Sequence, residues 1–376
     1  MRILTTHVGS LPRPANLLDL MKASLAGKAS PGYEESVRQA VQDCVRMQAQ
    51  SGIDIVADGE QSKPGFFTYV QQRLEGFEQR PQMKKPIFAA EVNAFPEYYA
   101  EYFKQAMTGG AIAPVVPLVC TGPVRYRGEE ALQRDIRNLK QAASAAGAHA
   151  AFMPAVAPSG VGDNEYYASE EEYFHAVGQA LRTEYKAIID AGLLLQVDDP
   201  FLCDIFVDPA VEPAKRPARA EMYVEAINES LRGIPPEKVR FHTCYGINEG
   251  PRIHEAALAD VVGYMLKVNA GAYSFEAANP RHEHEYHLWE SVKLPAGKAL
   301  IPGVITHASN IVEHPELIAE RLLRFARLVG PENVIAGADC GFSSQAMYRT
   351  EVHPTVIWEK FRAMRQGADL AAKAFG

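Results

Sequence analysis

The sequence predicts an α/β protein of the (β/α)8 TIM-barrel class, and three observations support this prediction. Short apolar segments alternate along the chain with longer amphipathic ones, as parallel strands and their crossover helices do. Several apolar segments show no polar alternation, which is typical of strands buried on both faces. No Gly-x-Gly-x-x-Gly motif follows the first strand, and this weakens a dinucleotide-binding doubly wound sheet as the alternative.

More strands are predicted than an eight-stranded barrel needs, so one of the segments must be surplus. AAFMPAVAPSG, which starts at residue 150, is a candidate for a long βα loop instead of a strand. The predicted strands are 3–9, 53–59, 113–122, 150–156, 192–199, 239–244, 271–277, 299–306 and 333–340.

Three helices between these strands are predicted from apolar residues at helical spacing. The first covers 33–52 and the second 169–192, and both end on a glycine that suits a helix C-terminus. Ser169 and Glu172 have the spacing of a capping box at the start of the second helix. The third helix covers 314–330.

The chain of 376 residues is predicted to form one catalytic barrel domain over residues 1–376. Barrels of this class reach such a length as single domains, and no low-complexity linker divides the sequence. Residues 76–112 are the least regular part, and we interpret them as an excursion from the barrel, either a lid or a hairpin.

Composition and charge restrict the partners of the protein. The net charge is −8 and the sequence has no cluster of Lys and Arg, which argues against nucleic acid or an anionic membrane as partner. No apolar run reaches the roughly 18 residues of a membrane span, and the N-terminus lacks the features of a signal peptide, so we expect a cytoplasmic protein. The five cysteines form no disulfide framework. The sequence is compatible with a homo-oligomer as well as with a monomer.

Polar residues at the ends of the predicted strands point to a metal site. His242 and Cys244 are two positions apart, so their side chains lie on the same face of a strand. In a barrel the C-terminal ends of all strands meet at one mouth, which would bring Glu276 and Cys340 to the same place. Such nitrogen, thiolate and carboxylate ligands suit tetrahedral zinc. The alternative is that both cysteines are simply buried apolar residues.

Other polar groups have simpler interpretations. The segment RHEHEYH (281–287) lacks the His-Glu-x-x-His spacing of a helical zinc site, and we interpret it as a polar, partly solvated loop. The Asp-Asp-Pro at 198–200 is also typical of a turn at a strand end. Cys120 is predicted to serve in packing alone.

Eight short motifs occur in one order along nearly the whole chain. They are THVGSLPRP at the start, DGE (58–60), TGPV (121–124), QVDDP (196–200), HTCY (242–245), FE (275–276), PGVITH (302–307) and ADCG (338–341). As an ordered set they make the chain resemble the C-terminal catalytic barrel of cobalamin-independent methionine synthase and its shorter, single-barrel relatives. Asp199 stands where the family has a glutamate, and RYRGEEAL replaces a tryptophan-containing stretch after TGPV.

The resemblance implies a zinc-dependent methyltransferase that acts on a small thiol such as homocysteine, with a separate alkyl donor. It implies Zn²⁺ ligands at His242, Cys244, Glu276 and Cys340. It also implies that Ser10 contacts the substrate carboxylate, that Glu60 and Asp198 hold its ammonium group, and that His307 donates a proton to the leaving group.

Three other functions stay open from the sequence. An epoxyalkane:coenzyme M transferase-like enzyme would open an epoxide with a zinc-bound thiol, and its sulfonate substrate would need Arg or Lys; Arg125, Arg127, Arg252 and Arg281 are the candidates. A metal-free barrel resembling uroporphyrinogen decarboxylase would have no need for Cys244 or Cys340. The last alternative is a non-catalytic thiol- or metal-binding protein.

Overall fold

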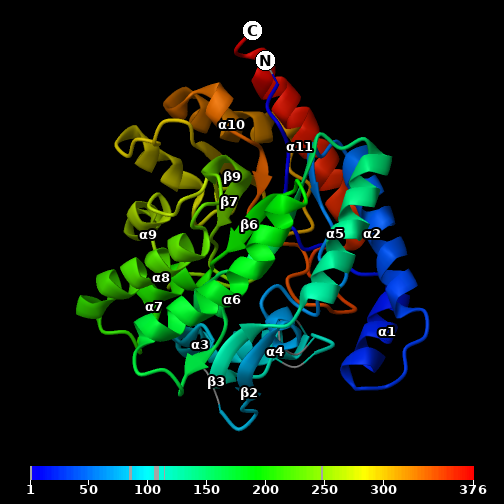
Figure 1. Cartoon of the computed structure of the whole chain (residues 1–376). Coiled ribbons are helices and arrows are strands. Elements are labelled where there is room, and N and C mark those ends of the chain that lie inside the picture. Colours follow the sequence, from blue (N-terminus) through cyan, green and yellow to red (C-terminus); the bar gives the residue numbers. More distant parts are fainter. Residues whose placement is uncertain (1, 84–86, 106–109, 114, 247–248) are drawn as a thin grey trace.

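A computed structural model describes residues 2–83, 87–105, 110–113, 115–246 and 249–376. Its centre is a curled sheet of seven strands in the order β1-β4-β6-β7-β8-β9-β10, and every neighbouring pair is parallel (Figure 1). The strands are β1 (Ile55–Ala57), β4 (Ala150–Val156), β6 (Leu194–Asp198), β7 (Val239–His242), β8 (Ala272–Phe275), β9 (Ala299–Ile305) and β10 (Gly337–Ala338).

The N-terminal segment closes this sheet into a barrel. On one side, the backbone N–H of Ala336 donates to the carbonyl of Leu4 and that of Thr6 donates to the carbonyl of Ala336, both at 2.8 Å. On the other side, the N–H of Ile55 donates to the carbonyl of Thr5 at 3.1 Å. The segment therefore pairs with both edges of the sheet and takes the position of the eighth barrel strand. The predicted (β/α)8 class is confirmed.

A buried arginine links the N-terminal segment to the middle of the sheet. Arg240 on β7 donates from Nη1 to Thr6 Oγ1 at 2.8 Å and from Nη2 to the carbonyl of His7 at 2.7 Å. Its guanidinium also lies over the ring of Phe152, 3.9 Å from the centroid. Because a buried charge is costly without partners, these contacts fix the position of the segment that leads to Ser10.

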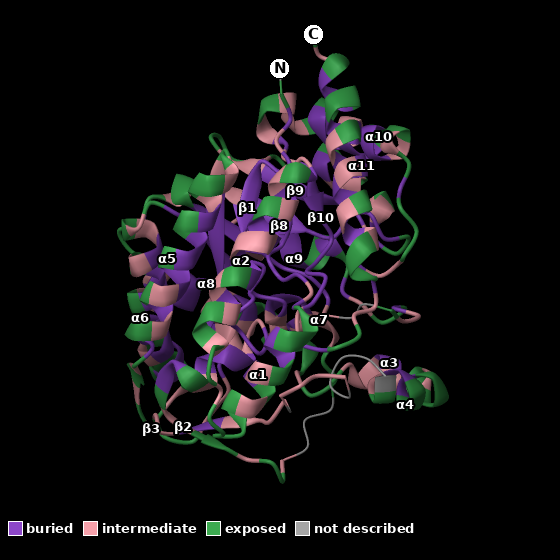
Figure 2. Ribbon diagram, turned by 90° about the vertical axis from the view of Figure 1, so that its right-hand side faces the viewer, coloured by how far each residue is buried: buried purple, intermediate pink, exposed green. Residues whose placement is uncertain are grey.

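Helices cover the outside of the barrel, and their buried faces point inward (Figure 2). Those predicted over 33–52, 169–192 and 314–330 are found as α2, α6 and α10. In α6 the Ser169 hydroxyl accepts the Glu172 N–H at 3.1 Å, as the capping-box spacing predicts. The helices around the barrel are α1 (Ala15–Leu25), α2 (Tyr33–Gln50), α5 (Glu129–Ala146), α6 (Glu170–Asp190), α7 (Phe201–Val207), α8 (Arg216–Ser230), α9 (Leu258–Met265), α10 (Pro315–Val329) and α11 (Pro354–Lys373).

The surplus strand is not the one proposed from the sequence. The segment at 150–156 is the barrel strand β4, between β1 and β6 and buried over almost its whole length. The strand near 113–122 is instead β3 (Leu118–Tyr126), which belongs to a separate three-stranded sheet with β2 (Leu74–Gln79) and β5 (Asp163–Asn164). Only part of β3 is buried, as expected for a strand outside the core.

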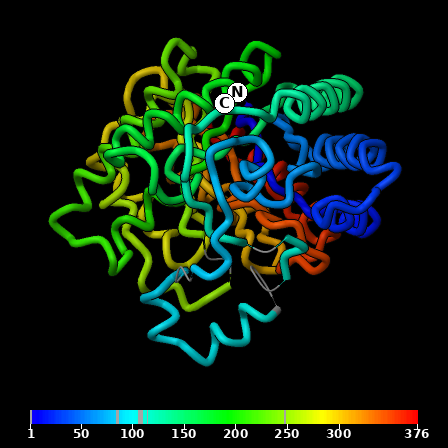
Figure 3. The backbone as a smooth tube through the Cα atoms, turned by 60° about the horizontal axis from the view of Figure 1, so that its bottom comes forward, coloured from blue at the N-terminus to red at the C-terminus, as the bar shows by residue number. Residues whose placement is uncertain are grey.

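The segment around 76–112 contains two short helices, α3 (Ala89–Ala94) and α4 (Pro96–Gln105). With β2 and β3 they lie at the end of the barrel where the strands finish, away from the chain termini (Figure 3). Residues 84–86 and 106–109 of this predicted excursion, and residue 114 of the predicted strand, lie outside the described residues. Among the helices that the structure describes, none combines the length and the apolar character needed to cross a membrane.

Candidate metal centre at the mouth of the barrel

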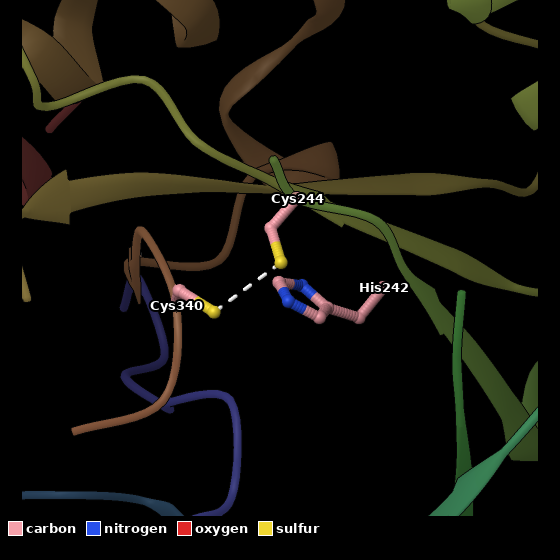
Figure 4. Close-up of side chains that lie close together, drawn as sticks. All are labelled: His242, Cys244 and Cys340. Atoms are coloured by element: carbon pink, nitrogen blue, oxygen red, sulfur yellow. Dashed lines mark hydrogen bonds between the residues drawn. The ribbon is translucent and has the colours of Figure 1, made fainter. Parts of the chain in front are cut away.

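Three of the four predicted metal ligands lie together at the mouth (Figure 4). His242 is the last residue of β7, Cys244 follows two positions later, and Cys340 follows β10. The ligand atoms of all three residues lie within 4.8 Å of one another, and the two sulfur atoms are 3.3 Å apart. All three side chains are buried. The prediction that strand ends far apart in the sequence meet at one rim is confirmed for these three residues.

The His242 ring is prepared to act as a metal ligand. Burial, followed by the positive charge of Arg240, lowers the pKa of His242 to about 3, so the imidazole is neutral. Nδ1 lies 3.2 Å from the Ser274 hydroxyl. Within the described part of the chain Nε2 is buried and has no hydrogen-bond partner. A buried nitrogen lone pair without a partner, next to two sulfur atoms, is what an imidazole ligand offers to a metal.

The thiols of Cys244 and Cys340 are hydrogen-bonded to each other. The hydrogen bond with Cys340, together with burial, raises the pKa of Cys244 well above its ordinary value. A metal cation at this place would reverse the effect, because thiols become thiolates when they coordinate zinc. One imidazole and two thiols fit zinc better than they fit the hard cations Mg²⁺ and Ca²⁺, which prefer oxygen.

Glu276, the fourth predicted ligand, lies in an adjacent group. One carboxylate oxygen, Oε2, accepts hydrogen bonds from Arg252 Nη2 at 2.7 Å and Asn279 Nδ2 at 2.6 Å. The other, Oε1, accepts the Tyr245 N–H at 3.3 Å. Its ligand atoms lie within 4.8 Å of those of His307 and Asp339. Coordination of a metal by Glu276 therefore stays a prediction.

Asp339 connects this second group to the cysteine loop. Its Oδ1 accepts the backbone N–H groups of Ala277 and Ala278 at 2.8 and 2.7 Å, directly after Glu276. Burial, followed by the charge of Glu276, raises the pKa of Asp339 to about 7. Since Cys340 is the next residue, these bonds position the third candidate metal ligand relative to β8.

The predicted substrate residues Ser10 and Glu60 approach the metal centre from the N-terminal half. The Ser10 carbonyl accepts the Phe342 N–H at 3.0 Å. The Ser10 hydroxyl lies against Gly341, and a Cβ on Gly341 would overlap this hydroxyl. Glu60 has the left-handed backbone angle φ of 55°, which is uncommon for a residue with a side chain. A Cβ on Gly9 would lie 3.7 Å from Glu60 Oε1, so the Glu60 side chain borders the segment that carries Ser10.

Glu60 and Asp198 place two buried carboxyl groups near each other. Burial raises the pKa of both, and the charge of Glu60 raises that of Asp198 further. Lys63 opposes the effect at both residues, but its Nζ donates to the Pro154 carbonyl at 2.6 Å and lies 4.2 Å from the centre of the Tyr69 ring. Asp198 Oδ1 accepts from Gln196, while Glu60 Oε2 is buried with no partner among the described residues. Two such carboxyls suit a cationic ligand group.

The RHEHEYH segment was only partly predicted. The segment is not a loop, because Glu283–Glu290 form a 3-10 helix, η5. His284 and His287 are exposed as expected, but His282 is only 4% exposed. Its Nε2 lies 2.9 Å from Glu255 Oε2, and its Nδ1 lies 2.8 Å from Glu285 Oε2. Although burial lowers it, these two carboxylates raise the pKa of His282 to about 9. The spacing of the motif held no signal for Glu255, which comes from another loop.

Other sequence candidates have structural roles or exposed side chains. Asp199 Oδ1 accepts the Leu202 N–H at 3.2 Å and the Ser159 hydroxyl at 2.8 Å, as the turn interpretation predicts. Cys120 is fully buried on β3. Of the four candidate arginines, Arg125, Arg127 and Arg281 are exposed, whereas Arg252 is buried and bonded to Glu255 and Glu276.

Comparisons with known proteins identify the family of this chain. Residues 3–94 and 155–362 match the model of the family described as "Cobalamin-independent synthase, Catalytic domain". A methionine synthase of Sulfolobus acidocaldarius is 25% identical over 339 residues, covering 90% of this chain and 85% of the relative. One of Thermococcus kodakarensis is also 25% identical, over 344 residues, covering 90% of this chain and 86% of the relative.

Solved structures show the same fold. The structure of a B12-independent methionine synthase from Shewanella sp. W3-18-1 in complex with selenomethionine has a TM-score of 0.74 at 20% identity and covers 100% of this chain and 99% of its own. A putative vitamin-B12-independent methionine synthase from Listeria monocytogenes has a TM-score of 0.67 at 20% identity, covering 98% and 99%.

Proposed function

The chain belongs to the family of cobalamin-independent synthase catalytic domains, and from this premise we propose that it transfers a methyl group to the sulfur of homocysteine. The observation that carries the proposal is the buried group of His242, Cys244 and Cys340 at the mouth of the barrel. We propose that these residues hold Zn²⁺ and that Glu276 is the fourth ligand when no thiol is bound. The bound zinc would supply a Lewis acid that keeps the substrate thiol deprotonated at neutral pH.

Ser10, Glu60 and Asp198 are the proposed binding residues for the amino-acid part of homocysteine. The Ser10 hydroxyl, which lies beside Gly341, would donate to the substrate carboxylate. Glu60 and Asp198 would hold the ammonium group, since two buried carboxyl groups gain most from a cationic partner. Binding would then orient the sulfur toward the proposed metal ligands.

His307 is the proposed proton donor. It is buried, and its ligand atoms lie within 4.8 Å of those of Glu276 and Asp339. An imidazole ring can act as a general acid and protonate the atom that departs from the methyl group. The neighbouring carboxyls would stabilise the protonated ring.

The opening of an epoxide by coenzyme M is the weaker candidate. Its sulfonate needs a free cationic side chain at the mouth. Arg125, Arg127 and Arg281 are exposed, and Arg252 is already bonded to two carboxylates. The pair Glu60 and Asp198 would also repel an anionic thiol. These observations favour an amino-acid thiol.

We further propose that the chain works as one catalytic domain in which 76–112 forms an excursion over the mouth. The cysteines are all free thiols, which suits the reducing cytoplasm as the proposed place of action.

The test is metal analysis of the wild type beside Cys244→Ser and Cys340→Ser, with Cys120→Ser as a matched control from the separate sheet. We expect nearly one zinc per chain in the wild type and the control, and strong loss in the other two. Activity with homocysteine and methyl donors, against coenzyme M with an epoxide, tests the substrate. Equal zinc in all four proteins would refute the site, and turnover of the epoxide alone would refute the substrate.

A further inference from the structure

We propose that Arg252 is a positioning residue that draws the Glu276 carboxylate away from the metal and so makes room for the thiol, and that Glu91 of the excursion fixes Arg252 in the required place. The inference rests on the proposed function, because it concerns the fourth position of the proposed zinc site. Glu276 and Arg252 form an ion pair at 2.7 Å whose side chains are 0% and 5% exposed.

Arg252 has an unusual backbone conformation for its residue type. Its φ is 56°, in the left-handed region that residues with a side chain rarely adopt. Such a conformation persists only where the surroundings hold it, and it is common at functional sites. Here it directs the guanidinium inward, where Nη2 meets Glu276 and Nε meets Glu255.

Glu91 on α3 holds this conformation from the other side. Its Oε2 accepts the backbone N–H of Arg252 at 3.1 Å, and its Oε1 accepts that of His254 at 2.6 Å. Glu91 is 2% exposed, and the Tyr99 hydroxyl donates to its Oε2 at 3.3 Å. A carboxylate from the excursion therefore serves as the backbone acceptor for the loop that carries Arg252.

The remaining contacts prevent Arg252 from following Glu276. Glu255, which binds Arg252 through Oε1, is held through Oε2 by His282 at 2.9 Å. His282 is in turn held by Glu285 and stacks on the Tyr245 ring, with 3.9 Å between the ring centres. Because Glu91 holds the Arg252 backbone and Glu255 holds its guanidinium, in this proposal Glu276 is the side chain that moves when the pair opens.

A fixed guanidinium and a metal compete for the same carboxylate. A stronger ion pair between Arg252 and Glu276 means weaker coordination of the metal by Glu276. The fourth position on the metal then stays open to the thiol. Because the two equilibria are linked, a contact that weakens coordination of the metal by Glu276 strengthens thiol binding by the same factor. Arg252 should therefore lower the affinity for zinc alone and raise the affinity for homocysteine.

The test compares Arg252→Met and Glu91→Gln with Asp208→Asn. Asp208 borders the same cavity of about 110 Å³ as Glu91 and Glu255, but it is exposed, and among the described residues its side chain accepts the Ala210 N–H alone, so it serves as a carboxylate control outside the network. Zinc affinity is measured by competition with a chromophoric chelator, without any thiol. L-Homocysteine affinity is measured from the absorption spectrum of the Co²⁺-loaded proteins, which requires no turnover.

For Arg252→Met we expect zinc binding on the order of 10-fold tighter and homocysteine binding on the order of 10-fold weaker, within the range known for residues that support metal ligands. Glu91→Gln should shift both constants in the same directions by less, and Asp208→Asn should shift neither. Weaker zinc binding in Arg252→Met, or two unchanged constants in both variants, would overturn the inference while leaving the proposed function intact. Absence of zinc from the wild type would overturn the proposed function and the inference together.

If Arg252→Met does not fold, Glu91→Gln alone decides the question, because it leaves the Arg252 side chain in place. Opposite shifts of the two affinities in Glu91→Gln would support the inference. Parallel shifts, or none, would overturn it.

Discussion

Replacing Gly303 by alanine tests how closely β9 and β10 must approach to build the site. Gly303 pairs with Gly337 across the two strands. A Cβ at position 303 would overlap Asp339 Oδ1 and lie 2.7 Å from both the backbone N and the Cα of Asp339. Since two of these atoms belong to the backbone, no rotation of a side chain can relieve the overlap.

The cost has two parts. Overpacking in a tight core costs about 1–3 kcal/mol. Moving the Asp339 carboxyl also weakens its bonds to Ala277 and Ala278, and a bond to a charged group contributes about 1.5–3 kcal/mol. We expect Gly303→Ala to lower the free energy of unfolding by about 3–5 kcal/mol and to weaken zinc binding, because Cys340 must move with Asp339.

Denaturant unfolding followed by circular dichroism measures the stability, and chelator competition measures the zinc affinity. Gly263→Ala is the matched control, since Gly263 is an exposed residue of α9 where a Cβ meets nothing within 4 Å. It should gain about 0.5–1 kcal/mol through helix propensity. A Gly303→Ala protein within about 1 kcal/mol of the wild type and with full zinc would refute the reasoning.

Three further predictions concern the metal, a half-buried acid and a helix cap. Removing zinc with a chelator should lower the melting temperature of the wild type, and adding Zn²⁺, but not Mg²⁺, should restore it. The chelator should leave the melting temperature of Cys340→Ser unchanged. An equal shift in both proteins would contradict a site at Cys340. Burial, followed by the charge of Asp199, raises the pKa of Asp204 to about 7. The folded protein thus binds this proton more tightly than the unfolded chain, and the contribution present below about pH 4 is lost as the pH rises through 7. Denaturant titrations should therefore show Asp204→Asn about 1–3 kcal/mol more stable than the wild type at pH 8 and equal to it near pH 4; a constant difference would count against the shifted pKa. Ser169→Ala should lose about 1 kcal/mol of unfolding free energy with unchanged zinc content, because the N–H of Glu172 loses its acceptor; no loss would show that solvent replaces the cap.

The sequence was sufficient for the barrel and for the proximity of three candidate metal ligands, because both follow from the pattern of parallel strands. Apolar runs mark buried strands, and strand ends of a parallel barrel share one rim, so His242, Cys244 and Cys340 could be placed together without coordinates. The same reasoning misassigned the surplus strand. An apolar run shows that a strand is buried, but it does not show which sheet buries it, and β3 pairs with β2 instead of a barrel strand.

The surroundings of Glu276 could not be read from the sequence. They depend on Arg252 in a left-handed conformation, which local sequence does not indicate for an arginine. They also depend on Glu91, which reaches the loop of Arg252 from a helix more than a hundred residues earlier in the chain. Likewise, His282 is buried only because Glu255 and Glu285 enclose it.

The segment at Leu4 and Thr6 closes the barrel, and this sets the order in which the strands can pair during synthesis. Arg13 donates to the Ser343 carbonyl across 330 positions of sequence, and Ala336 pairs with the segment at Leu4 and Thr6. This segment precedes the other barrel strands in the chain and pairs with the segment at Ile55 early, but it gains its second neighbour only when the segment at Ala336 has been made. Until β10 emerges, the nascent sheet keeps two open edges, which are the surfaces by which unfinished chains associate. A chain of this topology should mature slowly and depend on chaperones while it waits.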